Sequence, residues 1–185
     1  MEKRFKMIRM FFALAILAII FFVLGYSVES IAMDGAGKGG LKMKLTSPEF
    51  ENNSFIPGKY TCQGDDINPT LTIENIPQGA KGLALIVDDP DAPMGTWVHW
   101  VVYDIPIISR IDEGTIPGKQ GLNDFRKRDY GGPCPPSGTH RYFFKIYALD
   151  KMLNLKEGVS KKNLEKSMEG HILDKAELIG LYKKI

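Results

Sequence analysis

The chain has 185 residues, 44% hydrophobic and 25% charged, which is ordinary for one packed domain and excludes a fibrous or disordered protein. Its formal net charge is +2, and residues 1–32 hold four of the 24 basic and two of the 22 acidic residues, which leaves 20 of each in the remainder. A neutral domain without a basic stripe or an RNA-binding motif argues against nucleic acid as a partner.

Residues 1–32 have the pattern of a targeting segment. Basic residues at positions 3, 4, 6 and 9 precede an uncharged, largely apolar run over residues 10–28. The run approaches the about 20 residues that span a bilayer and also matches a long signal-peptide core, so a cleaved signal peptide and a retained N-terminal membrane anchor both stay open. Ser30 and Ala32 suit the small-residue positions of a signal peptidase site. Either alternative predicts an extracytoplasmic domain, which is periplasmic, secreted or anchored to the outer face of the cytoplasmic membrane.

A Gly-rich stretch at residues 33–40 predicts a flexible tether, so the folded domain is expected at residues 41–185. The two cysteines, Cys62 and Cys134, lie far apart in this domain and lack the paired spacing of a zinc site. In an oxidising compartment they could form one disulfide, and two buried thiols remain the alternative.

Three segments have the composition of strands: GLALIVD at 82–88, WVHWVVYDI at 97–105 and RYFFKIYAL at 141–149. Each is apolar on both faces, which predicts strands that are covered on both sides. Between the second and third, residues 106–136 are rich in Gly, Pro and Asp and predict a long, ordered excursion without a helix.

The last part of the domain changes to a helical pattern. Leu164, Met168 and Ile172 recur every four residues behind Ser160, a favourable N-cap, which predicts a helix over residues 161–172. A further segment at 176–182 fits either a short helix or a strand.

Two polar segments lie directly beside the predicted strands. DDPDAP at residues 88–93 leads to His99, and GGPCPP at residues 131–136 leads to His140. Because each proline fixes one backbone dihedral, these segments predict a rigid rim.

Alternation of side chains along a strand predicts which residues share a face. His99 is expected on one face with Trp97 and Val101, and His140 is expected on one face with Tyr142. If these faces meet, histidines, a tyrosine and carboxylates would converge on an apolar cavity, which is the usual anatomy of a ligand pocket.

Longer stretches of the sequence resemble one known family. DDPDAP, the Trp-x-His strand start and GPCPPSGTHRYFFKIYALD are similar to the two signature segments of the phosphatidylethanolamine-binding protein family, especially its bacterial and archaeal branch related to Raf kinase inhibitor protein. The resemblance continues through KYTCQGDDINPTL and MEGHIL and covers residues 43–182. It implies a mainly β fold, a β-sandwich with a large central antiparallel sheet, a smaller sheet and a few peripheral α-helices.

The resemblance also implies a binding protein without enzymatic activity or a cofactor. The ligand-binding pocket that it implies comprises seven residues: Asp89, Asp91, Pro93, His99, Gly132, His140 and Tyr142. Because a carboxylate repels phosphate, Asp89 or Asp91 would either hold a histidine in a donating state or accept from a ligand ammonium. The Tyr142 hydroxyl and the Gly132 N–H would be further donors. The expected ligand is a small anionic or phosphate-bearing group, such as phosphoethanolamine or a phosphorylated ligand.

Two other functions fit the same residues. Metal-assisted hydrolysis could use the Asp/His cluster as ligands that activate water, and a weaker variant makes Ser137 a nucleophile beside His140. An interaction module could instead capture a phosphorylated or acidic side chain of a kinase, phosphatase or protease and inhibit that protein.

Overall fold

The structure is a computed structural model that describes residues 41–184. The predicted targeting segment and tether, residues 1–32 and 33–40, lie outside these residues. Among the helices of residues 41–184, none combines the length and the apolar character that a membrane crossing requires.

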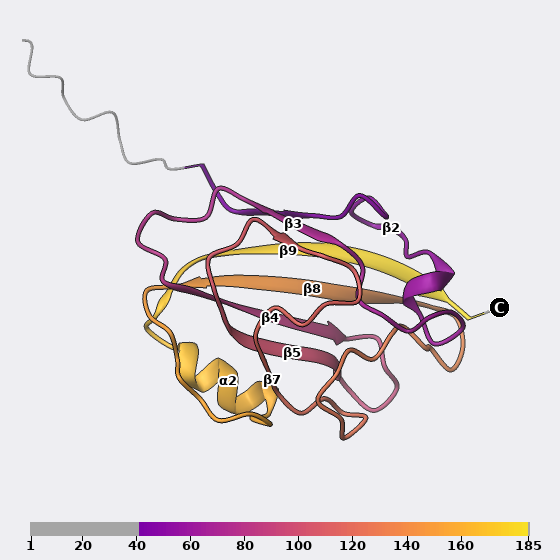
Figure 1. The fold of residues 1–185 in the computed structure, drawn as a ribbon. Coiled ribbons are helices and arrows are strands. Elements are labelled where there is room, and N and C mark those ends of the chain that lie inside the picture. Colours follow the sequence, from indigo (N-terminus) through magenta and orange to yellow (C-terminus); the bar gives the residue numbers. More distant parts are fainter. Residues whose placement is uncertain (1–40, 185) are drawn as a thin grey trace, which may run out of the picture. The chain divides into compact units, whose positions relative to one another are not determined.

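Two β-sheets dominate the described part of the chain (Figure 1). The large sheet has six strands in the order β2-β9-β8-β4-β5-β7, and every neighbouring pair is antiparallel except β2 and β9. Its strands are β2 (Ser54–Phe55), β4 (Gly82–Asp89), β5 (Trp97–Ile105), β7 (Lys119–Gln120), β8 (Thr139–Leu149) and β9 (Ile172–Lys183). The small sheet has the order β1-β3-β6, with β1 at Lys44–Thr46, β3 at Leu71–Glu74 and β6 at Arg110–Ile111. The predicted mainly β fold with a large and a smaller sheet is therefore confirmed.

The small sheet covers one face of the large sheet. Leu71 and Ile73 of β3 pack in one buried cluster with Leu85 of β4 and Phe144 of β8, and each of these side chains is at most 2% exposed. Burying four such side chains contributes roughly 1.5–3 kcal/mol each. This cluster holds the two sheets together as a sandwich.

The opposite face of the large sheet is covered by α2 (Lys161–Met168). Leu164 and Met168 of this helix pack against Ile86 and Val101 in a second buried cluster. The side chain of Ser160 accepts a hydrogen bond from the backbone of residue 163, which confirms the predicted N-cap. Among the described residues, the only other helix is a short 3-10 turn, Gly58–Tyr60.

The three predicted strands are confirmed as β4, β5 and β8, and the ambiguous segment at 176–182 belongs to the strand β9. The predicted helix is too long, because α2 ends at Met168 and Ile172 is the first residue of β9. Gly170 explains this end, since its φ of 75° is left-handed and interrupts the helix.

The predicted faces of β5 need a correction at His99. On β4, Val87 pairs with Trp100 and the next residue, Asp88, pairs with Val98, so His99 is an extra residue that bulges out of the ladder. Trp100 consequently packs in the cluster under the small sheet, whereas Val101 packs in the cluster under α2. Val101 therefore does not share the face of His99, because the bulge resets the alternation.

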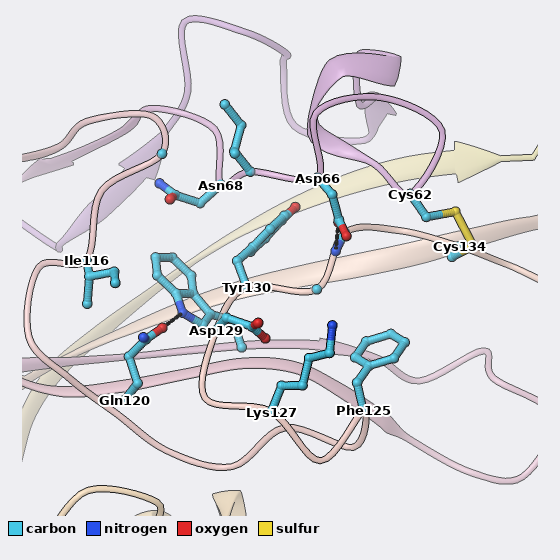
Figure 2. Close-up of a pocket in the computed structure, with 15 residues that line it drawn as sticks. Cys62, Asp66, Asn68, Ile116, Gln120, Phe125, Lys127, Asp129, Tyr130 and Cys134 are labelled. Carbon is cyan, nitrogen blue, oxygen red and sulfur yellow. Dashed lines mark hydrogen bonds between the residues drawn. A yellow bond between two sulfur atoms is a disulfide. The ribbon is translucent and has the colours of Figure 1, made fainter.

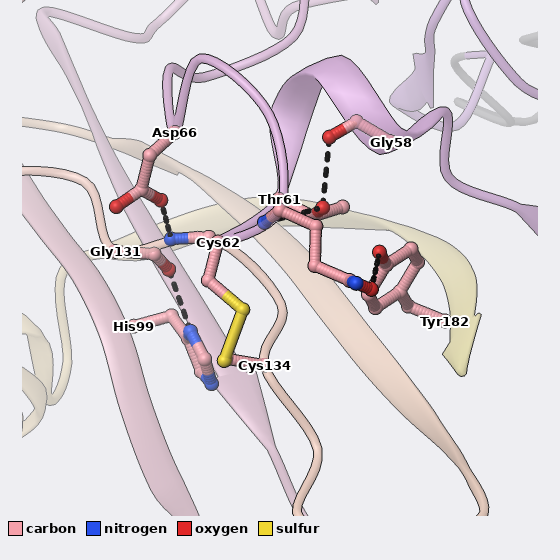
Figure 3. Close-up of a disulfide and its surroundings, with 10 residues drawn as sticks. Gly58, Thr61, Cys62, Asp66, His99, Gly131, Cys134 and Tyr182 are labelled. Carbon is pink, nitrogen blue, oxygen red and sulfur yellow. Dashed lines mark hydrogen bonds between the residues drawn. A yellow bond between two sulfur atoms is a disulfide. The ribbon is translucent and has the colours of Figure 1, made fainter. Parts of the chain in front are cut away.

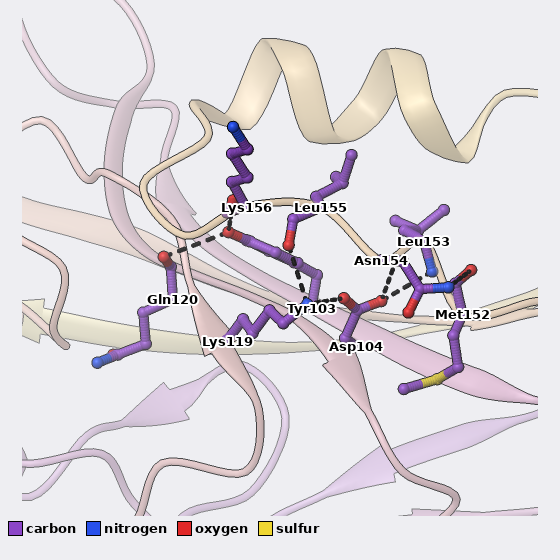
Figure 4. Close-up of polar contacts among 9 residues, drawn as sticks. All are labelled: Tyr103, Asp104, Lys119, Gln120, Met152, Leu153, Asn154, Leu155 and Lys156. Carbon is purple, nitrogen blue, oxygen red and sulfur yellow. Dashed lines mark hydrogen bonds and ion pairs between the residues drawn. The ribbon is translucent and has the colours of Figure 1, made fainter.

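Asp104 connects the end of β5 to the segment that leads to α2 (Figure 4). Its carboxylate accepts hydrogen bonds from the backbone N–H groups of Leu153 and Asn154, at 2.7 and 3.0 Å, and from Lys119 Nζ at 3.0 Å. The side chain is only 5% exposed and the residue has a left-handed φ of 52°, which Asp tolerates better than most residues. Asp104 thus joins three segments that are distant in sequence.

We expect Asp104→Ala to lower the free energy of unfolding by about 2–3 kcal/mol, because it removes the shared acceptor and puts Ala in a left-handed conformation. Urea denaturation measures this change. The matched control is Asp112→Ala, which removes a carboxylate from an exposed pair with Arg110 and should cost less than about 0.5 kcal/mol. Equal losses in the two variants would contradict this role of Asp104.

Candidate ligand-binding pocket

A cavity of about 340 Å³ lies where β4 ends and β5 begins. Its lining residues are Asp89, Ala92, Pro93, Met94, Trp97, His99, Phe125, Cys134, Pro136 and Tyr142. Four of the seven sequence-predicted site residues are in this set: Asp89, Pro93, His99 and Tyr142. Its size and its mostly apolar wall with a few polar groups suit a small ligand.

His99 presents a defined nitrogen to the pocket. Its Nδ1 lies 2.6 Å from the carbonyl oxygen of Gly131, which can only accept, so Nδ1 carries a proton and donates it (Figure 3). Burial lowers the pKa of His99 and outweighs the opposing contributions of the Gly131 hydrogen bond and of nearby carboxylates, first among them Asp89. The neutral ring therefore offers the lone pair of Nε2 as an acceptor.

Tyr142 supplies a hydroxyl at the base of the pocket. The residue is fully buried on β8, and its ring packs edge-on against His99 with 5.2 Å between the centroids. Within the described part of the chain, Tyr142 Oη is the one buried side-chain N or O atom that forms no close hydrogen bond, although the backbone of Cys134 and the carboxylate of Asp89 lie near it. Burial, and secondarily the charge of Asp89, raises the pKa of this hydroxyl, which keeps it protonated and able to donate. A buried hydroxyl that faces a cavity and forms no close hydrogen bond is able to bind a ligand atom.

Asp89 completes the polar part of the pocket and is held from two sides. One carboxylate oxygen accepts from the backbone N–H of Asp91 at 2.8 Å, and the other lies 2.7 Å from His140 Nδ1. His140 is 7% exposed and does not line the pocket itself. The sequence-predicted His140 is thus positioned behind Asp89, where it fixes the carboxylate.

Asp91 lies at the rim and forms an ion pair. Both of its oxygens bind the guanidinium of Arg141, at 2.9 and 2.7 Å, and the Arg141 backbone N–H is a third donor. The Arg141 hydrogen bonds lower the pKa of Asp91 to about 2. This bidentate pair ties the 88–93 loop to β8 and engages Asp91, which does not line the cavity.

Gly132 does not have the role that the sequence predicted. Its N–H donates to Asp66 Oδ1 at 2.6 Å and is not available to an anion in the pocket. A side chain at this position would also collide with Asp66, because an added Cβ would lie 2.5 Å from that oxygen. Gly132 is therefore required for a close backbone contact and is not a ligand donor.

A disulfide joins Cys62 to Cys134 beside this contact (Figure 3). The Cys62 N–H also donates to the carbonyl of Pro133 at 3.2 Å. The disulfide and the Asp66–Gly132 bond together fasten residues 131–134 to the 58–66 segment. This fastening holds the Gly131 carbonyl that sets the His99 tautomer.

A second cavity, also of about 340 Å³, is lined in part by Asp66, Gly131, Gly132 and Cys134 (Figure 2). Phe125 and Cys134 line both cavities. Phe125 also packs against His99, with 5.3 Å between the ring centroids. It was not predicted as a pocket residue, because residues 106–136 have no hydrophobic periodicity from which its position could be inferred.

The polar groups do not assemble as a metal site. Across residues 41–184, no three His, Cys, Asp or Glu side chains are grouped so that they could hold a metal ion. The Asp and His side chains that metal-assisted hydrolysis would need as ligands are instead engaged in other hydrogen bonds. Asp89 binds His140, Asp91 binds Arg141, and His99 binds the Gly131 carbonyl.

The sandwich and its preformed pocket define a β-protein of the small-ligand-binding class. The profile described as "Phosphatidylethanolamine-binding protein" matches residues 46–183. A UPF0098 protein of Pyrococcus horikoshii is 51% identical over 162 residues, which cover 81% of each chain, and a UPF0098 protein of Aquifex aeolicus is 50% identical over 79% of this chain and 91% of the relative.

Solved structures agree with this assignment. A phosphatidylethanolamine-binding protein homologue of Chlamydia trachomatis is 46% identical with a TM-score of 0.76. YbcL of E. coli, described as a new member of the mammalian PEBP family, is 28% identical with a TM-score of 0.72. Each alignment covers 78% of this chain and 99% of the other. The chain belongs to the phosphatidylethanolamine-binding protein family, in its bacterial and archaeal branch.

We expect His99 to titrate below its ordinary pKa of about 6.5 and to be protonated on Nδ1 at pH 7. Nitrogen-detected NMR of the imidazole measures both properties, and His99→Gln assigns the signal. Because folding lowers the pKa of His99, the contribution of this residue to the free energy of unfolding is complete above the pKa of the unfolded state. The contribution decreases as the pH falls from the unfolded-state pKa to the folded-state pKa. A ring protonated on Nε2 at pH 7 would contradict the assigned hydrogen bond.

Proposed function

We propose that this chain is a binding protein that holds a small phosphate-bearing group in the pocket between Asp89, His99 and Tyr142. The observation that carries this proposal is the Tyr142 hydroxyl, a donor buried at the pocket base that forms no close hydrogen bond among the described residues. A ligand oxygen placed there would remove the cost of about 1–3 kcal/mol that an unsatisfied buried group imposes.

The carboxylate of Asp89 gives the site mixed sign. An ammonium group on the same ligand would lie favourably beside Asp89, while a phosphate oxygen accepts from Tyr142, so a zwitterion such as phosphoethanolamine suits the site. The mouth is apolar, with Met94 95% exposed and Phe125 39% exposed beside it. These apolar side chains at the pocket mouth would accommodate either the carbon chain of a lipid or a peptide segment next to a phosphorylated side chain. If the pocket binds a phosphorylated side chain of another protein, this chain would inhibit or modulate that protein.

The hydrolase alternative has no support from the residues that the structure describes, because they contain no metal-ligating group of three and the Asp and His side chains are already paired. The binding role is therefore the function that we propose.

Tyr142→Phe should weaken phosphoethanolamine binding about tenfold or more, because it removes the donor at the pocket base. The same change should leave the protein at least as stable, since it deletes a hydroxyl that forms no close hydrogen bond in the free protein. Calorimetric titration and thermal unfolding of residues 41–184 measure the two effects.

The matched control is Tyr103→Phe, which removes a buried hydroxyl bonded to the Lys156 carbonyl far from the pocket. That variant should lose about 1 kcal/mol of stability and keep its affinity. Replacing His99 and His140 together by Ala should also weaken binding. Equal heats of binding for the wild type, Tyr142→Phe and the double variant would overturn the proposed pocket.

We also propose that the domain works outside the cytoplasm. The pattern of residues 1–32 and the disulfide Cys62–Cys134 support this location, because disulfides persist mainly in oxidising compartments. Mass spectrometry of fractions from the native cells should find the chain outside the cytoplasm, either starting near residue 33 or full-length in the membrane. A full-length chain in the soluble cytoplasmic fraction would contradict the proposed location.

A further inference from the structure

The polar atoms of the pocket include more acceptors than donors. Asp89 has only acceptor oxygens, each of which already accepts one hydrogen bond and keeps a second lone pair. His99 donates from Nδ1 to Gly131 and so presents the bare Nε2 lone pair in its neutral form. The Tyr142 hydroxyl, which lies near the Asp89 carboxylate and the Cys134 backbone, is the side-chain donor of the pocket that forms no close hydrogen bond, and the Gly132 N–H is engaged by Asp66.

An oxyanion without a proton matches this arrangement poorly. One of its oxygens can accept from Tyr142, but the other oxygens meet the lone pairs of Asp89 and His99, and acceptors facing each other in a buried site repel. An oxyanion that carries one proton has a hydroxyl to donate to Asp89 or to His99 Nε2, while its charged oxygens accept from Tyr142.

We infer that, among ligands without an ammonium group, the pocket selects oxyanions in a protonated, hydrogen-donating form, which means the monoanion of a phosphate monoester, and rejects oxyanions that have no proton, such as a sulfate ester. The inference rests on the proposed phosphate-binding function and specifies the chemical state of the ligand. The selective atoms are Asp89 and His99 Nε2, whereas Tyr142 binds both kinds of ligand.

The charges around His99 determine which group takes up the proton. Asp88 and Asp89 on β4 and Asp124 in the loop after β7 all favour a charged ring, yet burial outweighs them and leaves the pKa of His99 below its ordinary value. A phosphate monoester has a second pKa near 6. Above the lowered pKa of His99, the ligand is therefore the proton carrier, and binding of phosphate should follow the titration of the ligand.

Methyl phosphate and methyl sulfate test this selectivity directly, because the methyl phosphate monoanion and methyl sulfate have the same charge and shape and differ by one proton. Calorimetry of residues 41–184 at pH 6 should show methyl phosphate binding about tenfold more tightly or better. Its affinity should fall as the pH rises to 8, since the monoanion is lost. Methyl sulfate affinity should rise only at the lower pH where His99 is protonated.

Two variants separate selectivity from general binding. Tyr142→Phe should weaken both ligands by a similar factor and leave their ratio unchanged. Asp89→Asn replaces an acceptor by an amide that can donate, so it should improve methyl sulfate relative to methyl phosphate and bring the ratio toward one. The wild-type ratio remains decisive if Asp89→Asn fails to fold.

Equal affinities of the two ligands for the wild-type protein at pH 6 would overturn the selectivity and leave the phosphate pocket standing. Binding of neither ligand, nor of phosphoethanolamine, would overturn the proposed function and the selectivity with it.

Discussion

The hydrogen bond from His99 Nδ1 to the Gly131 carbonyl is the constraint on which the pocket depends. At 2.6 Å it fixes the tautomer, and the tautomer decides that the pocket is faced by an acceptor. The carbonyl is held in place from the opposite side, where Asp66 binds the N–H of the next residue and the disulfide fastens the segment. Asp66 and Cys62, which do not line the pocket, therefore help to set the polarity of the binding site.

Strand β4 ends in two adjacent carboxylates, Asp88 and Asp89, that have different roles. Asp88 points to the α2 face, where it is fully buried between the ammonium groups of Lys145 and Lys161, at 2.7 and 2.5 Å. Asp89 points to the pocket, where a backbone N–H and His140 hold it without filling all its lone pairs. A charge with two counter-ions is structural, whereas a charge with spare acceptor capacity beside a cavity is poised for a ligand.

Much of this architecture could be predicted from the sequence. The apolar runs specify β4, β5 and β8, and the resemblance to the phosphatidylethanolamine-binding protein family identifies four residues that line the pocket. Local periodicity could not reveal the bulge at His99, because the extra residue is defined by its pairing with β4. The engagement of Gly132 by Asp66 was also out of reach, because it joins residues 66 positions apart through loops without a pattern. Sequence alone identifies the groups at the site, and long-range contacts decide which of them remain free.

A crystal structure of residues 41–184 with methyl phosphate would show directly which atoms of the pocket bind the ligand. We expect the phosphorus between Tyr142 and His99, with one ligand oxygen about 2.7 Å from Tyr142 Oη and another within hydrogen-bond reach of His99 Nε2 or Asp89. His99 Nδ1 should keep its bond to Gly131. A ligand bound instead in the second cavity beside Asp66, or a pocket in which Tyr142 Oη remains without a ligand contact, would contradict the proposed binding site.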